Sequence, residues 1–149
     1  MSTSNNHLKT YVGGCHCGAI RYSVEMDLSD GKASKCNCSI CLKSNRLSIT
    51  LDQDRFKLVS PASLTEIPEY QFGTMSQHHR FCAKCGIHCF AYGSYEWEGQ
   101  TVKNFGINAV TLDPGQGVDL RELKIAYWDG RDGNWAAGAM DKPPAGGCY

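Results

Sequence analysis

Nine cysteines occur in this chain of 149 residues, and seven of them fall into three tight clusters. The clusters are Cys15-His-Cys17, Cys36-Asn-Cys38-Ser-Ile-Cys41 and Cys82-Ala-Lys-Cys85. Thiolates this close repel one another unless a cation lies among them, and short spacings let one turn aim two sulfurs at a single ion. An odd number of cysteines also leaves one thiol over in any complete disulfide framework. The spacing therefore predicts zinc sites, and disulfides or redox thiols are the alternative.

The number of clustered sulfurs points to two sites rather than one. Seven ligands divide naturally into four and three; a closed four-cysteine site is structural, whereas three protein ligands keep a position open for water or substrate. Gly86 follows the Cys82-x-x-Cys85 pair and can take the positive φ that such a turn needs. A rival arrangement uses Cys89 as the fourth ligand of the second site, although Cys89 also fits a buried thiol on a strand. Cys148 stands alone near the C-terminus.

Charge and hydropathy narrow the choice of partner and compartment. Fifteen basic and fifteen acidic side chains give a formal charge of zero, which seven thiolates and two Zn²⁺ would lower to −3. Phosphate binding requires a basic face, so we expect no nucleic-acid partner. No apolar run approaches the roughly 18 residues of a membrane span, and the first nine residues lack the apolar stretch of a secretory signal. We therefore expect a cytoplasmic protein with no membrane partner, in a compartment where disulfides do not persist.

Short alternating runs predict a mainly β fold with short helical turns. The clearest run places Ile20, Tyr22, Val24 and Met26 on one face of a strand. Further strands are predicted over residues 46–51, 56–60, 64–67, 70–72, 87–92 and 102–112, and helical turns over 40–45 and 120–124. The length fits a single domain over residues 1–149, with residues 142–149 as a loose C-terminal tail.

The ordered cysteine motifs resemble one known family. Three segments carry the resemblance: Gly13-Gly-Cys-His-Cys-Gly-Ala-Ile-Arg-Tyr22, Cys36-Asn-Cys-Ser-Ile-Cys41 and Phe81-Cys-Ala-Lys-Cys-Gly86. They are similar to segments of the glutathione-dependent formaldehyde-activating enzymes, a family that includes the centromere protein V type domains. The similarity continues through Tyr70-Gln-Phe-Gly-Thr74, His79-Arg-Phe-Cys82 and the ending Asp129-Gly-Arg-Asp-Gly-Asn-Trp135. It covers nearly the whole chain.

The resemblance implies a fold, two metal ions and an activity. The fold is the β-tent, a mainly β zinc-binding architecture that holds two zinc ions per chain. On the family pattern the structural zinc is held by four cysteines, Cys15, Cys17, Cys82 and Cys85. The catalytic zinc is held by three, Cys36, Cys38 and Cys41. The implied activity is that of a carbon–sulfur lyase acting on a thiol adduct such as S-hydroxymethylglutathione.

The residues and the resemblance together leave three functions open. The first is a zinc-dependent carbon–sulfur lyase whose small-molecule partner, a glutathione-like thiol or an aldehyde adduct, binds at the open position of the three-cysteine zinc, where the metal lowers the pKa of the thiol. The second is a non-catalytic zinc module that binds glutathione or a protein partner. The third is a zinc-dependent hydratase, dehydratase or lyase of a specialised pathway, whose substrate has no thiol.

Several side chains near the clusters are candidates for the rest of a site. His79 is the candidate general acid or base, and a histidine packed near the metal is the alternative. Ser39, Lys43 and Asn45 flank the cysteine triple as candidate substrate-binding residues, and Lys43 could pair with a substrate carboxylate. Phe72 is expected to wall an apolar pocket, together with Tyr92, Tyr95 and Trp97, unless these rings belong to the core. The segment 129–135 is predicted to form a structural lock built on an Arg–Asp pair and a docked indole.

Overall fold

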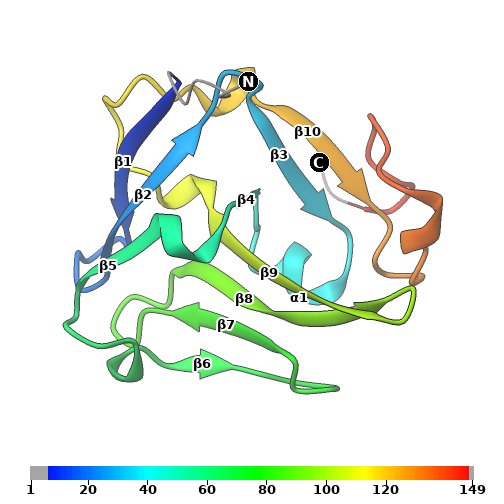
Figure 1. The fold of residues 1–149 in the computed structure, drawn as a ribbon, viewed down its shortest axis with the longest axis horizontal. Helices are drawn as coiled ribbons and strands as arrows, with labels where there is room; N and C mark the ends of the chain where they lie inside the picture. The colour runs from blue at the N-terminus through cyan, green and yellow to red at the C-terminus, as the bar shows by residue number, and fades with distance from the viewer. Residues whose placement is uncertain (1–6, 148–149) are drawn as a thin grey trace.

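The computed structural model describes residues 7–147, which fold into two β-sheets joined by short helical turns (Figure 1). Cys148 lies outside these residues. The smaller sheet has the order β1-β2-β5, and the larger has the order β10-β3-β4-β9-β8-β7-β6. This confirms the predicted mainly β class. No helix within residues 7–147 has the length and apolar character to cross a membrane.

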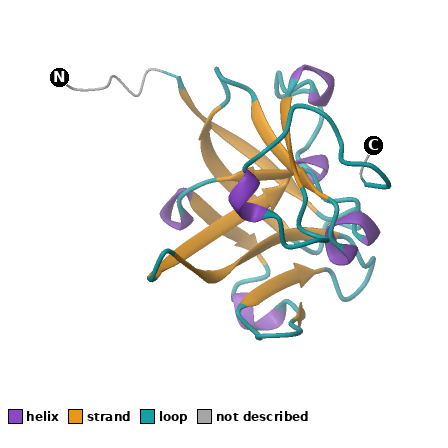
Figure 2. Ribbon diagram, turned by 90° about the vertical axis from the view of Figure 1, so that its right-hand side faces the viewer, coloured by secondary structure: helices purple, strands orange, loops and turns teal. Residues whose placement is uncertain are grey.

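The elements have the following bounds. The strands are β1 (Leu8–Gly14), β2 (Arg21–Asp27), β3 (Lys32–Cys36), β4 (Ser48–Thr50), β5 (Phe56–Ser60), β6 (Glu69–Tyr70), β7 (Gln77–Phe81), β8 (His88–Trp97), β9 (Gln100–Asn108) and β10 (Lys124–Trp128). The helical segments, purple in Figure 2, are α1 (Ser39–Lys43) and the 3-10 turns η1 (Gln53–Arg55), η2 (Leu64–Glu66), η3 (Ala109–Thr111), η4 (Leu120–Glu122) and η5 (Trp135–Ala137).

The alternation of β2 decides which of its faces enters the core. Ile20, Tyr22, Val24 and Met26 are each at most 4% exposed, as their spacing predicts. The Tyr22 hydroxyl lies 2.7 Å from the Thr111 hydroxyl, so the one polar atom of this buried ring is satisfied. Strand β5 has the bounds that the sequence predicts, residues 56–60.

Aromatic rings join the two sheets. Phe56 on β5 lies between Tyr22 of its own sheet and two rings of the larger sheet, Phe90 on β8 and Phe105 on β9. The ring centroids of Phe56 and Phe90 are 4.6 Å apart, and those of Phe56 and Phe105 are 4.8 Å apart. Such tilted pairs add to the apolar area that the rings remove from water. The core therefore lies between the two sheets.

Several predicted strands differ from the structure. The strand predicted over residues 46–51 is the shorter β4, and the one predicted over residues 87–92 is β8, which continues to Trp97. Residues 64–67 were expected to be extended, but η2 begins there because Ser63 and Glu66 form a capping box. The strand predicted over residues 70–72 is β6, which ends at Tyr70. The strand predicted over residues 102–112 is β9 up to Asn108, after which η3 turns the chain.

Strands β3 and β10, which the sequence pattern did not reveal, pair in parallel. Their last residues, Cys36 and Trp128, are register partners although 92 positions separate them in the chain. Because the carboxyl ends of parallel strands lie side by side, the loop after β10 and the cysteine triple after β3 meet at one end of the sheet.

Candidate metal centres

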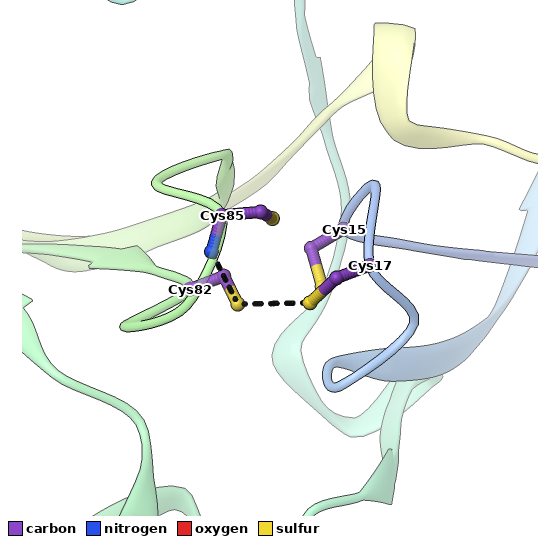
Figure 3. Close-up of side chains that lie close together, drawn as sticks. All are labelled: Cys15, Cys17, Cys82 and Cys85. Carbon is purple, nitrogen blue, oxygen red and sulfur yellow. Dashed lines mark hydrogen bonds between the residues drawn. The ribbon is translucent and has the colours of Figure 1, made fainter.

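Four cysteines from two hairpin turns converge at one point (Figure 3). Cys15 and Cys17 lie in the turn between β1 and β2, and Cys82 and Cys85 lie in the turn between β7 and β8. The four sulfurs all lie within 4.8 Å of one another. Since β1 and β2 belong to the smaller sheet and β7 and β8 to the larger, this group connects the two sheets.

The sulfur separations suit a tetrahedral thiolate site. The Cys15 and Cys17 sulfurs are 3.6 Å apart, as are those of Cys17 and Cys82. Four sulfurs at 2.3 Å from one zinc ion are separated by about 3.8 Å, whereas a disulfide would bring two of them to about 2.05 Å. All eight cysteines within residues 7–147 are free thiols.

Backbone N–H groups point at these sulfurs and favour their thiolate form. The Ile20 N–H donates to the Cys15 sulfur at 3.2 Å, and the Lys84 and Cys85 N–H groups donate to Cys82 at 3.4 Å. The backbone N–H groups of Cys17 and Ile87 lower the pKa of Cys85 to about 6. Gly86 has φ 78°, as its position after the second pair predicts.

The remaining three clustered cysteines form a second, local group. Cys36 ends β3, Cys38 caps α1 and Cys41 lies within α1, and their sulfurs also lie within 4.8 Å of one another. The neighbouring thiols of Cys36 and Cys41 lower the pKa of Cys38, and the pKa of Cys41 is raised in turn by these two neighbours. No other His, Cys, Asp or Glu of residues 7–147 joins this group.

Cys89 does not lie in the three-cysteine group. It is completely buried on β8, and its thiol donates to the Ile87 carbonyl at 3.7 Å. Burial raises the pKa of this thiol to about 12, and the charges that act on it are those of the four-cysteine group. The structure therefore favours the buried-thiol interpretation over a fourth ligand at the second site.

The loop after β10 packs against the three-cysteine group. A Cβ atom at Gly130 would lie 2.5 Å from the Cys36 sulfur and 2.7 Å from the Trp135 ring, so only glycine fits between them. Asn37, only 2% exposed, donates to the Asp129 carboxylate at 2.8 Å and accepts the Arg131 N–H at 2.9 Å. The predicted Arg–Asp pair of segment 129–135 is therefore wrong for the described residues: Asp129 bonds to Asn37, and the Arg131 side chain donates to the Gly146 carbonyl.

Replacing Asn37 with alanine is expected to release this loop. The substitution removes both hydrogen bonds at once and costs about 1–3 kcal/mol of unfolding free energy. The Arg131 amide should exchange with solvent faster, which hydrogen exchange can measure. Asn134→Ala is the matched control, because Asn134 is exposed and its side chain forms no hydrogen bond within residues 7–147. Equal exchange in the two variants would contradict this account of the loop.

His79 is buried on β7, in the larger sheet. It is 7% exposed, and its ring stacks on Phe72 with centroids 5.8 Å apart. Burial lowers its pKa to about 4, helped by the positive charge of Arg46, while the charge of Cys38 acts in the opposite direction. The imidazole is therefore neutral at neutral pH. The Nδ1 atom of His78, the preceding residue, lies 2.6 Å from the Glu69 carboxylate.

The other predicted site residues lie in different parts of the fold. Ser39 and Lys43 are exposed on α1, and Asn45 follows α1 with φ 50°. Phe72, 47% exposed, is the ring that the structure places against His79. The expected aromatic wall is not assembled as a group: Tyr92 packs on Phe105 in the core, and Tyr95 and Trp97 lie exposed toward the far end of β8.

Arg46 is a residue near the site that the sequence pattern did not single out. Its charge acts on His79 and His88, and the thiols of Cys41, Cys38 and Cys36 act on it. An arginine five residues after the last cysteine of the triple was the available signal. The sequence did not show that the Arg46 charge acts on His79 and His88, because β7 and β8 lie far from Arg46 in the chain.

Both cysteine groups fit zinc by the chemistry of their donors. Thiolate sulfur is a soft ligand that zinc prefers, whereas magnesium and calcium prefer oxygen. Four sulfurs form a closed set, and three leave a position for another ligand. The two cysteine groups could therefore hold two zinc ions, one in each.

Comparisons with known proteins agree with this picture. The family model described as glutathione-dependent formaldehyde-activating enzyme matches residues 10–124, which include all seven clustered cysteines and end before the loop of residues 129–135. The crystal structure of a protein from Rhodobacter sphaeroides is 30% identical to this chain, with a TM-score of 0.60. The match covers 78% of this chain and 98% of the other.

Proposed function

Because the chain belongs to the glutathione-dependent formaldehyde-activating enzyme family, we propose that it is a zinc-dependent carbon–sulfur lyase acting on a thiol adduct such as S-hydroxymethylglutathione. One observation carries the proposal: the sulfurs of Cys36, Cys38 and Cys41 converge, and the charge of Cys38 acts on the buried, neutral imidazole of His79. The four-cysteine group would hold a second zinc ion, whose role is to stabilise the fold.

The residues have separate tasks in this proposal. Cys36, Cys38 and Cys41 would hold the zinc ion, which would supply a position for the substrate sulfur and favour its thiolate form. His79, neutral because its pKa is about 4, accepts a proton rather than donating one at the start of the reaction. The stack on Phe72 holds the plane of the imidazole.

The bond changes in the lyase direction balance without a redox partner. The hydroxyl proton of the hemithioacetal passes to His79, and the electrons of that O–H bond form the C=O bond of the aldehyde. The C–S bond breaks, and its electron pair leaves on sulfur as a thiolate. The protonated imidazole then returns the proton to the thiolate or to solvent, so the reverse sequence forms the adduct.

A non-catalytic thiol-binding module is the second candidate, and one observation favours it. A histidine with a pKa of about 4 is a weak base, and it gives general-base catalysis less driving force than a group with a pKa near 7. On this view the same three sulfurs bind a thiol through zinc but do not accelerate its release from an adduct.

The rate of exchange between glutathione and its formaldehyde adduct separates the two candidates. The zinc-loaded protein should accelerate this exchange, which can be measured by magnetisation-transfer NMR. His79→Gln should lower kcat by about 10²–10⁴, whereas His78→Gln is the matched control because His78 contacts Glu69 instead. Thiol binding without acceleration by the unmodified protein would establish the binding module.

A further inference from the structure

We infer that Arg46 receives a carboxylate of the ligand, so that the three-cysteine site selects thiols and thiol adducts that carry an acidic group. The inference rests on the proposed function, because it assumes that the ligand sulfur occupies the site of Cys36, Cys38 and Cys41. It assigns the choice of substrate to a residue outside the cysteine motifs.

The end of α1 determines where Arg46 lies. The Asn45 N–H bonds to the Leu42 carbonyl and the Arg46 N–H bonds to the Cys41 carbonyl, a pairing that makes a Schellman motif. Asn45, with φ 50°, occupies the left-handed position of this motif. The chain therefore turns back immediately after the cysteine triple, and Arg46 is held by a backbone hydrogen bond to one of the three cysteines.

The larger sheet leaves room for the guanidinium group. Gly106 on β9 is buried, and a Cβ atom there would lie 3.2 Å from the Arg46 Nη2 atom, closer than ordinary contact. In the sheet, Gly106 pairs with Ala91 on β8, and Ala91 pairs with His79 on β7. The row between Arg46 and His79 thus carries no side chain larger than a methyl group.

Arg46 differs from every other arginine within residues 7–147. Arg21, Arg55, Arg80 and Arg121 each pair with a carboxylate, and Arg131 donates to a backbone carbonyl. The Arg46 guanidinium forms no hydrogen bond or ion pair with any residue of this range. It forms no hydrogen bond with the three sulfurs, although their charges are the ones that act on it.

These observations point to a ligand anion beside the sulfurs. A half-buried guanidinium group is best stabilised when an anion and hydrogen-bond acceptors face it. Its planar fork of N–H donors matches the two oxygens of a carboxylate, which it binds through two parallel hydrogen bonds. A small thiol with a carboxylate, bound through its sulfur at the cysteine triple, presents such an anion to Arg46.

Two thiols of nearly the same shape test the inference. 3-Mercaptopropionate carries a carboxylate where 3-mercaptopropionamide carries a neutral amide. Each is titrated into the cobalt-loaded protein, and the change in sulfur-to-cobalt charge-transfer absorption reports binding. The unmodified protein should bind the acid about tenfold or more tightly than the amide, and Arg46→Gln should abolish this preference. Arg46→Lys keeps the charge but loses the fork, so part of the preference should remain.

Two further variants control for charge and for location. Lys57→Gln removes one exposed positive charge from β5, in the smaller sheet, and should keep the preference for the acid over the amide. Lys43→Gln removes the exposed cation of α1, and loss of the preference there instead of at Arg46 would overturn the inference. Equal weakening of both thiols by Arg46→Gln would also overturn it, since Arg46 would then only balance the charge of the thiolates. If neither thiol changes the cobalt spectrum, the proposed function itself fails.

Discussion

Cys82→Ser is expected to leave the domain unfolded. Cys82 is 2% exposed, and its sulfur lies 3.6 Å from that of Cys17 across the junction of the two sheets. Structural zinc in small domains contributes about 10–16 kcal/mol of binding free energy, whereas a whole domain is stable by only about 5–15 kcal/mol. Loss of one of the four zinc ligands therefore removes an amount of free energy comparable to the total stability of the domain. Circular dichroism and urea unfolding measure the loss.

The control for this experiment is a cysteine with the same burial and another role. Cys89→Ser changes a fully buried thiol on β8 that lies outside both cysteine groups. This substitution should cost about 1–2 kcal/mol and leave the zinc content at two per chain. A folded Cys82→Ser protein that retains both zinc ions would contradict the structural role of the four-cysteine group.

Cys41→Ser is expected to abolish activity in a protein that stays folded. The three-cysteine group spans only residues 36–41, so it does not join the sheets, and a serine hydroxyl does not ionise to replace the thiolate ligand. Zinc content should fall from two to one per chain, and exchange of the formaldehyde adduct should lose its protein-dependent acceleration. Elemental analysis, the NMR exchange assay and a thermal unfolding curve measure the three effects.

The two cysteine variants together test which site does which task. The unmodified protein should also release one zinc ion to a mild chelator and retain the other, since three protein ligands hold an ion less firmly than four. Equal resistance of the two ions would favour two closed sites and hence the binding module. If Cys41→Ser unfolded the protein while Cys82→Ser remained folded, the two roles would have to be exchanged.

The strands that the sequence predicted well are those whose own side chains decide their burial. β2 alternates strongly, and Tyr22 and Val24 are each 1% exposed. The turn at residues 64–66 was missed because a local capping box outweighed the apolar residues Leu64 and Ile67. Strands β3 and β10 were missed because their parallel pairing exists only when segments about 90 residues apart meet.

The sequence by itself indicated the three cysteine clusters, because the spacing of cysteines within each turn controls where their side chains can point. The fold brings the turns at Cys15–Cys17 and Cys82–Cys85 together in one group. It did not reveal that Asn37 anchors the loop after β10, or that Arg46 lies over Gly106 facing the row that leads to His79. Those contacts depend on strand order and register in the larger sheet, which is a property of distant segments. Tertiary structure therefore decided what surrounds the sulfurs, because it fixes which distant side chains lie near them.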